Sequence, residues 1–326
     1  MADLDRIRGN SFVIIGRAGM DFYPDPPGTK TEEANRFFAC LGGSSANIGA
    51  AITRHGGKAA LVTRVSDDAI GRFACNELDR YGVDRTHVKP VGGEARNSLA
   101  VVETRVEDHQ SVIYRNGAAD FEMTIADVEA VDYAPFSALI TTGTVFAAEP
   151  SRTAAFRGFE LARAAGLPLI FDVDYRPYSW PSPEVASEVY SRAAALCDVI
   201  VGNDLEFGFM AGGIEKGLDK ARDLARSGAR IVIYKMGELG AITITPETEF
   251  RTGIYPVEAL KPTGAGDSFL GGFVAALARG RDLRDAVLRG SACASIVVSR
   301  VGCAPAMPTT PELETFLAGH PGPTEP

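Results

Sequence analysis

A glycine-rich stretch that ends in an acidic residue is the part of the sequence most able to do chemistry. It reads Thr263-Gly-Ala-Gly-Asp267, and apolar residues such as Phe269 and Phe273 follow it at helical spacing. A helix is therefore predicted to begin at the glycines, where free N–H groups and the helix dipole favour an anion. A carboxylate beside such an anion site is suited to accept a proton from a substrate hydroxyl. The alternative is that Asp267 only caps the helix and that Thr263 ends a loop.

Size and charge limit the ligands that this sequence can bind. The chain has 326 residues, of which 45% are hydrophobic, enough for one large α/β domain or two small ones. Its net charge of −9 offers no basic surface to nucleic acid or to an anionic membrane, so neither is expected as a partner. Any phosphate must be bound by a local group of donors, and ATP would meet that requirement.

The thiol content and the N-terminus indicate a cytoplasmic protein. The sequence contains five cysteines: Cys40, Cys75, Cys197, Cys293 and Cys303. An odd number without a CxxC pair argues against a disulfide framework and against a zinc site. The first residues are acidic and lead into only a short apolar run, so neither a signal peptide nor a membrane anchor is expected.

The elements that must hold the functional residues alternate between strands and helices. Residues 12–15 and 59–65 are predicted as buried strands, and strands near 138–141, 169–171 and 199–201 are each followed by a helical segment. Such alternation favours a parallel sheet with helices on both faces. Ligands bind such sheets beyond the carboxyl ends of the strands, so polar residues at those ends are the candidates.

The N-terminal part of the chain offers groups for binding hydroxyls. Asp21 lies beyond the first strand, and Gly42-Gly43-Ser44 with Asn47 opens a helix of small residues. Exposed amides and the Asn47 side chain can hold hydroxyl groups. The alternatives are that Asp21 is a surface residue of a proline-rich loop and that Ser44 simply caps the helix.

Arginine at the end of a predicted hairpin indicates an acidic ligand. Residues 98–106 and 111–114 form two β-rich runs separated by a polar turn, and Arg115 follows them. A guanidinium group can bind a carboxylate through two parallel hydrogen bonds. The alternative is an exposed hairpin arginine.

Three later strand ends carry charged or amide groups. Asp174 and Arg176 follow one strand, and Arg176 could meet a phosphate or a substrate carboxylate, or form a weak surface ion pair with Asp174. Asn203 and Glu206 follow the next strand, and an amide with a carboxylate suits a hard, partly hydrated cation. Lys235 ends a further strand, where it could reach phosphate or be an edge lysine.

The run from Thr263 to Gly272 closely resembles the C-terminal signature of the ribokinase-like (PfkB) carbohydrate kinases, and the resemblance extends over nearly the whole chain. It implies an α/β ribokinase-like three-layer sandwich, with a mostly parallel central sheet, helices on both faces and a small β lid. The lid would comprise about residues 17–41 and 94–118 of a single domain spanning 1–326, with a flexible tail over 319–326.

The resemblance also implies roles for individual residues. Asp267 would be the catalytic base, and the amides of Gly264, Ala265 and Gly266 would form the anion hole. The residues that would bind the sugar are Asp21, Gly42, Gly43, Asn47, Asn97, Tyr114, Arg115 and Arg176. The residues that would bind ATP are Asp174, Asn203, Lys235, Gly237, Gly240, Thr263 and Gly302. Asn203 and Glu206 would organise Mg²⁺ through water, and the chain would form a homodimer through the lid.

Within the family, segments 172–180, 260–267 and 300–308 are similar to those of members that phosphorylate 5-dehydro-2-deoxygluconate to its 6-phosphate in myo-inositol catabolism. The alternative acceptor is 2-dehydro-3-deoxygluconate, also a keto sugar acid, or another sugar of the family. A non-catalytic sugar-acid sensor on the same fold is a further alternative. Retention of Asp267, Asn203 and Glu206 weighs against it.

The sequence departs from the family pattern at Lys261-Pro262, where many members carry Asp-Thr in a loop that binds a monovalent cation. The ammonium group of Lys261 could replace the bound ion, which puts potassium activation in doubt. The alternative is that Lys261 points to solvent. No GxxxxGK[ST] motif occurs, so the chain is not a P-loop enzyme.

Overall fold

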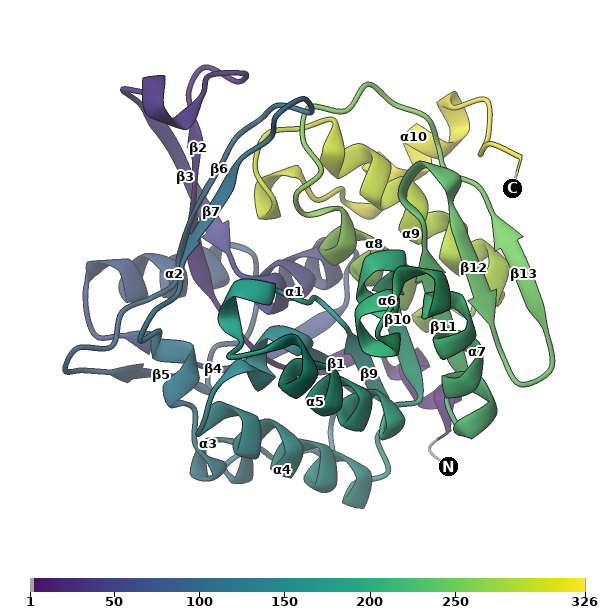
Figure 1. The fold of residues 1–326 in the computed structure, drawn as a ribbon, viewed down its shortest axis with the longest axis horizontal. Helices are drawn as coiled ribbons and strands as arrows, with labels where there is room; N and C mark the ends of the chain where they lie inside the picture. Colours follow the sequence, from purple (N-terminus) through teal and green to yellow (C-terminus); the bar gives the residue numbers. More distant parts are fainter. Residues whose placement is uncertain (1–2, 326) are drawn as a thin grey trace.

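The computed structural model describes residues 3–325, and within them nine strands form one large sheet of order β13-β12-β11-β10-β9-β8-β1-β4-β5 (Figure 1). These strands are β1 (Ser11–Ile15), β4 (Lys58–Ser66), β5 (Val88–Val91), β8 (Ala138–Thr142), β9 (Leu169–Asp172), β10 (Val199–Asn203), β11 (Ile231–Lys235), β12 (Ala241–Ile244) and β13 (Glu249–Thr252). Every pairing from β5 to β11 is parallel, whereas β12 and β13 add an antiparallel edge. The carboxyl ends of the parallel strands therefore meet at one edge, where ligands bind in such sheets.

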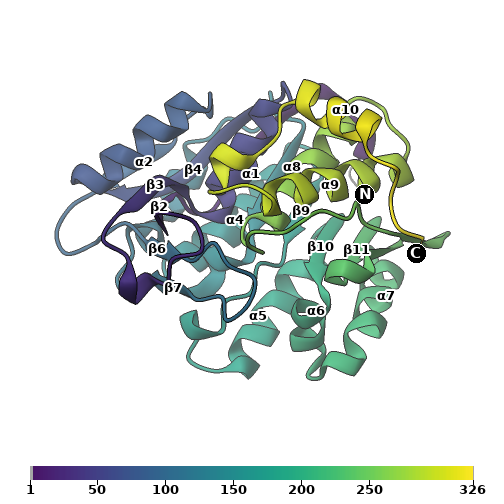
Figure 2. The same ribbon diagram turned by 90° about the horizontal axis from the view of Figure 1, so that it is seen from above.

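Helices cover both faces of this sheet (Figure 2). The helices are α1 (Ser44–Arg54), α2 (Ala69–Arg80), α3 (Ile125–Glu129), α4 (Ser151–Ala164), α5 (Pro183–Ala195), α6 (Asp204–Ala211), α7 (Gly217–Ser227), α8 (Ala265–Ala278), α9 (Leu283–Val298) and α10 (Thr310–Gly319). Apolar residues of α3 to α7 pack on one face, and those of α1, α2, α8 and α9 pack on the other. In β1, Val13 and Ile15 belong to the first core and Phe12 and Ile14 to the second, because successive side chains point to opposite faces. The predicted three-layer α/β fold is confirmed.

A second, smaller sheet stands beside the large one (Figure 1). In the described part of the chain it has the order β3-β2-β6-β7, formed by β2 (Gly19–Pro24), β3 (Phe37–Gly42), β6 (Leu99–Val102) and β7 (Ser111–Tyr114). The pair β2 and β6 is parallel, and the other two pairs are antiparallel. The ranges predicted for the lid, 17–41 and 94–118, enclose all of these strands except Gly42. That this sheet acts as a lid stays a prediction.

The C-terminal segment contacts the body of the protein. Nε2 of His320 donates a hydrogen bond to the Pro256 carbonyl oxygen over 3.0 Å, and the Thr324 amide donates to the Ile254 carbonyl oxygen over 2.7 Å. The flexibility expected for this tail stays a prediction, and residues 1, 2 and 326 lie outside the described part of the chain.

The state of the cysteines and the character of the helices complete the description of the fold. All five cysteines are free thiols within residues 3–325, and all but Cys75 are buried. Among the described residues, no helix has the length and apolar character needed to cross a membrane.

Candidate active site

The glycine-rich loop begins α8, as its composition predicts. Gly264 is the N-cap residue and has φ 85°, a left-handed conformation that favours glycine. Asp267 lies in the first turn of α8 rather than at the N-cap. Its carboxylate instead accepts a hydrogen bond of 3.0 Å from Nδ2 of Asn47, so the interpretation of Asp267 as a simple cap is wrong.

The environment of Asp267 holds its carboxyl ready for proton exchange near neutral pH. Burial, together with the nearby Asp174 carboxylate, raises the pKa of Asp267 from 3.8 to about 7. The hydrogen bond from Asn47 opposes this rise because it stabilises the ionised form. A carboxyl group tuned in this way suits general base catalysis near pH 7.

The start of α1 faces the same site. Gly43 caps α1 with φ 92°, and a Cβ atom there would lie 2.6 Å from the Arg17 carbonyl oxygen, so glycine is required. Ser44 does not cap the helix, because its hydroxyl donates a 2.6 Å hydrogen bond to Asp174. The Oδ1 atom of Asn47 is buried and has no hydrogen-bond partner within residues 3–325. A substrate hydroxyl could satisfy this acceptor.

Asp174 and Arg176 form a partly buried ion pair just beyond β9. Nη2 of Arg176 lies 2.7 Å from Oδ1 of Asp174, and the backbone of Asp174 has φ 38°, an uncommon value for a residue other than glycine. Burial acts to raise the pKa of Asp174, but the Arg176 guanidinium and the Ser44 hydroxyl outweigh it and the pKa is lowered. Asp174 is therefore an ionised anchor between β9 and α1.

Asp21 is buried against Gly42, in the adjacent strand of the small sheet. A Cβ atom on Gly42 would overlap the Asp21 carboxylate, which explains the glycine. Burial raises the pKa of Asp21 from 3.8 to about 7, against the opposing effects of Arg17 and Lys261. Asp21 is thus not a surface-loop residue, and its carboxyl group is available to bind a hydroxyl.

Three residues predicted to contact the sugar have other surroundings. Tyr114 is 62% exposed on β7. The Asn97 amide oxygen accepts a 2.7 Å hydrogen bond from the Ser66 amide, so this side chain joins β4 to β6. Arg115 is buried and pairs with Asp120 at 2.5 Å, so the alternative of an exposed hairpin arginine is wrong. Substrate contacts by these three residues stay predictions.

The opposite side of the Asp267 loop carries the groups predicted to meet nucleotide and metal. A Cβ atom on Gly266 would lie 3.4 Å from Nζ of Lys235, so this ammonium lies beside the loop predicted to form the anion hole. Asn203 and Glu206 form a capping box at α6: the Asn203 amide donates to Glu206 over 2.7 Å, and the Glu206 amide donates back over 2.8 Å. Burial raises the pKa of Glu206, and Lys235 opposes that rise.

The remaining predicted nucleotide residues are conformationally special. Gly237, Gly240 and Gly302 have φ values of 57°, 80° and 83°. A Cβ atom on Gly240 would overlap the Thr252 carbonyl oxygen, so the backbone packing requires glycine here whether or not a nucleotide is bound. Thr263 contributes its carbonyl oxygen as an acceptor for Lys261. Nucleotide binding by these residues stays a prediction.

Lys261 lies inside the protein beneath the loop. Its side chain is 0% exposed, and Nζ donates to the carbonyl oxygens of Thr263 at 2.5 Å and Val297 at 3.4 Å. Burial lowers the pKa of Lys261, while Asp267 and Asp21 are among the groups that oppose this. The alternative that Lys261 points to solvent is wrong.

Sequence reasoning missed Arg17, Asp120 and Asp172. Arg17 lies two residues beyond β1 and is buried in the site, and Asp172 ends β9, where burial raises its pKa well above the usual range. Arg17 and Asp172 both lie at the ends of predicted strands, and this position could have marked them as candidate site residues. Nothing in the sequence pointed to Asp120 as the partner of Arg115.

Comparisons with known proteins bear on this site. The chain matches the family described as pfkB family carbohydrate kinase over residues 10–310. It is similar to the 5-dehydro-2-deoxygluconokinase of Photobacterium profundum, with 37% identity over 310 residues that cover 94% of each chain. It is also similar to the protein of the same name from Geobacillus kaustophilus, with 35% identity over 97% of this chain and 96% of that protein.

Solved structures share the fold. The fructokinase from Vibrio cholerae O395, in its fructose-, ADP- and calcium-bound form, has a TM-score of 0.83 and 27% identity, over 95% of this chain and 99% of its own. The aminoimidazole riboside kinase from Salmonella enterica, complexed with aminoimidazole riboside and an ATP analog, has a TM-score of 0.80 and 27% identity, over 95% and 100%. The family match, the relatives above 30% identity and the assembled Asp267 loop agree, and the chain belongs to the pfkB family of carbohydrate kinases.

Proposed function

We propose that this chain transfers the γ-phosphoryl group of ATP to the 6-hydroxyl of 5-dehydro-2-deoxygluconate. The observation that carries the proposal is the Asp267 carboxylate, held by Asn47 at the N-terminal turn of α8. The choice of acceptor is supported by relatives with that enzyme name over 94% or more of the chain. The choice of nucleotide is supported by structural neighbours solved with ADP or an ATP analog.

Asp267 is the proton acceptor in this proposal. With a pKa of about 7, a large fraction of the carboxylate is ionised at neutral pH and can take the proton of the 6-hydroxyl. The amides of residues 264–266 stabilise the negative charge of the transferred phosphoryl group. Lys235, whose Nζ lies beside Gly266, adds a positive charge on the same side. Catalysis then rests on positioning and on charge stabilisation.

Magnesium fits this site as an ion held through its water shell. Among residues 3–325, no group of three or more His, Cys, Asp or Glu side chains is arranged to hold a metal directly. Mg²⁺ keeps several waters when it binds nucleotides, and the Glu206 carboxylate with the Asn203 amide can accept hydrogen bonds from them. When bound, Mg²⁺ would neutralise charge on the β- and γ-phosphates.

The Lys261 ammonium takes the place of a monovalent cation in this proposal. It contacts two backbone carbonyl oxygens, one of them Thr263 in the loop before the anion hole. Such carbonyl oxygens are also the usual ligands of a hard cation. A covalently fixed charge removes the need for a dissociable ion at that point.

Dimerisation through the small sheet is a further part of the proposal. Phe37 on β3 and Val112 on β7 are each more than 40% exposed and lie on the same face of the sheet by its register, and apolar side chains exposed on one face favour a protein contact. Light scattering of the wild type and of Phe37→Asp tests this. A dimer that the substitution converts to monomer supports the contact, and a wild-type monomer contradicts it.

The acceptor is tested by measuring ADP release with a panel of sugars. The panel comprises 5-dehydro-2-deoxygluconate, 2-dehydro-3-deoxygluconate and fructose, each with ATP and Mg²⁺. The highest kcat/KM is expected for 5-dehydro-2-deoxygluconate. Phosphorus NMR of the product should show coupling of the phosphate to the C6 protons. A higher value for either other sugar would reassign the acceptor, and no ADP release with any member would refute the kinase proposal for these substrates.

A further inference from the structure

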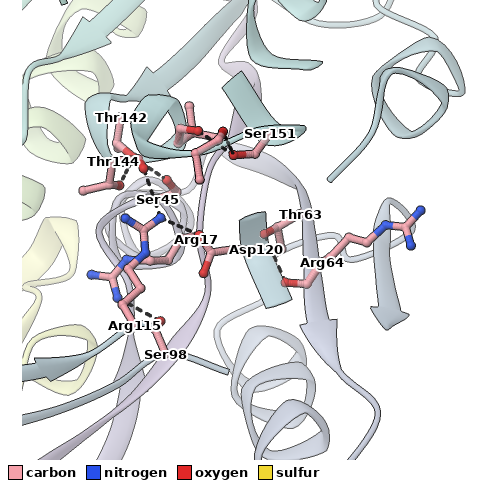
Figure 3. Close-up of polar contacts among 12 residues, drawn as sticks. Arg17, Ser45, Thr63, Arg64, Ser98, Arg115, Asp120, Thr142, Thr144 and Ser151 are labelled. Carbon is pink, nitrogen blue, oxygen red and sulfur yellow. Dashed lines mark hydrogen bonds and ion pairs between the residues drawn. The ribbon is translucent and has the colours of Figure 1, made fainter. Parts of the chain in front are cut away.

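Arg17 is a buried cation in the active site that neither the family motif nor the predicted binding residues include. It lies two residues beyond the end of β1 and is only 6% exposed. Its carbonyl oxygen accepts a 3.2 Å hydrogen bond from the amide of Ala46 in the first turn of α1, so its backbone position is fixed. Figure 3 draws its side chain with that of Arg115 and with the hydroxyl groups around them.

The guanidinium group of Arg17 has one edge without a protein partner. Its Nη1 donates a 2.9 Å hydrogen bond to the Ser98 hydroxyl. Its Nε is buried and unpartnered among the described residues, and within the same residues no carboxylate oxygen lies within 4 Å of the group. Nε and Nη2 form the edge that binds a carboxylate through two parallel hydrogen bonds. A buried donor without a partner is costly, and a ligand anion would remove that cost.

The two other arginines of the site already have carboxylate partners. Nη2 of Arg115 pairs with Asp120 at 2.5 Å and donates to the Thr144 carbonyl oxygen over 3.0 Å, whereas its Nε and Nη1 are buried and unpartnered among the described residues. Arg176 pairs with Asp174 at 2.7 Å. Among residues 3–325, Arg17 is the one of these three arginines without a carboxylate partner, so its charge is the one left for a ligand.

Arg17 lies near the reacting end of the site but apart from the proposed phosphate side. Arg17 is joined to α1 at Ala46, and Asp267 is joined to the same helix at Asn47, so both residues approach the first turn of α1. In agreement, the positive charge of Arg17 acts to lower the pKa of Asp267 and of Asp21. Its contact with Ser98, directly before β6, places it toward the small sheet, whereas Lys235 lies beside Gly266.

We propose that Arg17 binds the carboxylate of the sugar-acid acceptor through its Nε and Nη2 edge and thereby selects an acid over a neutral sugar. The inference rests on the proposed function, since it names the residue that recognises the acidic group of the same substrate. Arg115 and Arg176, whose guanidinium groups were also predicted to bind the carboxylate, are then paired with Asp120 and Asp174 instead.

The test uses Arg17→Gln, which keeps a polar side chain but removes the charge and the two-donor edge. Binding of 5-dehydro-2-deoxygluconate and of its uncharged C1 amide is measured by calorimetry, and turnover of both by ADP release. Loss of charge-assisted hydrogen bonds costs about 1.5–3 kcal/mol, which is about 10- to 150-fold in affinity. We therefore expect Kd and KM for the acid to rise by that factor, and those for the amide by less than about threefold.

Two further variants keep the test decisive. Arg157→Gln removes an arginine of α4 that pairs with the exposed Glu129 at 2.9 Å, and it should leave both Kd values unchanged. Ser98→Ala removes the hydrogen bond that orients Arg17 but keeps its charge, so it should weaken acid binding about two- to tenfold even if Arg17→Gln does not fold. Ser98→Ala should leave amide binding unchanged.

The outcomes separate this inference from the proposed function. Equal weakening of acid and amide, or unchanged acid binding, in both Arg17→Gln and Ser98→Ala would overturn the role of Arg17 while leaving the kinase intact. A wild type that binds the acid through Arg17 but releases no ADP would overturn the proposed function alone. A wild type that neither binds nor phosphorylates the acid would overturn both.

Discussion

The Asn47 side-chain amide donates a 3.0 Å hydrogen bond to the Asp267 carboxylate, 220 residues further along the chain. The bond joins the first turns of α1 and α8, which come from opposite ends of the sequence. It fixes the direction of the proposed base and stabilises its ionised form against burial. The residues predicted to bind the sugar and those predicted to bind the phosphates therefore meet at this contact.

Loss of this contact should change the pH dependence of the reaction. In Asn47→Ala the ionised form of Asp267 loses a donor, so its pKa should rise above the wild-type value of about 7. The acidic limb of the kcat/KM profile should move to higher pH, with roughly tenfold lower activity at pH 6. Ser45→Ala, whose hydroxyl contacts Thr142 instead, is the control and should keep the wild-type profile. An unmoved acidic limb in Asn47→Ala would show that this bond does not tune the base.

Asp21 should make the stability of the free protein depend on pH. Burial raises its folded-state pKa from 3.8 to about 7, so the native state holds the proton longer than the unfolded state. Stability from this group is present below about pH 4 and is lost as the pH rises to about 7. Asp21→Asn cannot ionise, so its unfolding free energy relative to wild type should increase by roughly 3 kcal/mol between pH 4 and pH 8.

Urea unfolding at several pH values measures this difference. Asp5→Asn alters a side chain that is 76% exposed and should show no such trend. The same relative stability of Asp21→Asn at both ends of the pH range would contradict a buried carboxyl with a raised pKa.

Lys261 should make the enzyme independent of potassium. Wild-type activity should be the same with potassium chloride and with a bulky cation at equal ionic strength, because the charge at the Thr263 carbonyl is covalently fixed. Lys261→Ala should lose about 10- to 100-fold in kcat/KM, and potassium should restore part of it by occupying the vacated space. In Lys261→Met the side chain fills that space, so potassium should not restore the activity of this variant. Strong potassium activation of the wild type, or full activity of Lys261→Ala, would refute the idea of a fixed cation.

Local sequence patterns predicted the fold and part of the site. The helical spacing after Gly264 and the apolar run of β1 are local properties, so α8, the first strand and the position of Asp267 could be predicted. The antiparallel edge formed by β12 and β13 was not predicted, because their short runs carry no clear alternation.

Side-chain pairing could not be predicted in the same way. Ser44 could cap α1 by every local rule, yet its hydroxyl binds Asp174, 130 residues away. Arg115 was expected to be either exposed or bound to substrate, and it is buried with Asp120 as its partner. Arg17 was missed because its burial and its free edge depend on Ser98 and on the packing of α1, which the sequence around Arg17 does not encode.

The most direct test of the account is the activity of Asp267→Asn with 5-dehydro-2-deoxygluconate, measured by ADP release beside ATP binding by calorimetry. The substitution keeps the size of the side chain and removes its ability to take a proton. We predict a kcat about 10²- to 10⁴-fold below wild type, with ATP affinity within about threefold because the backbone amides of residues 264–266 remain. A variant that binds ATP normally and keeps a near-wild-type kcat would contradict the assignment of Asp267 as the base.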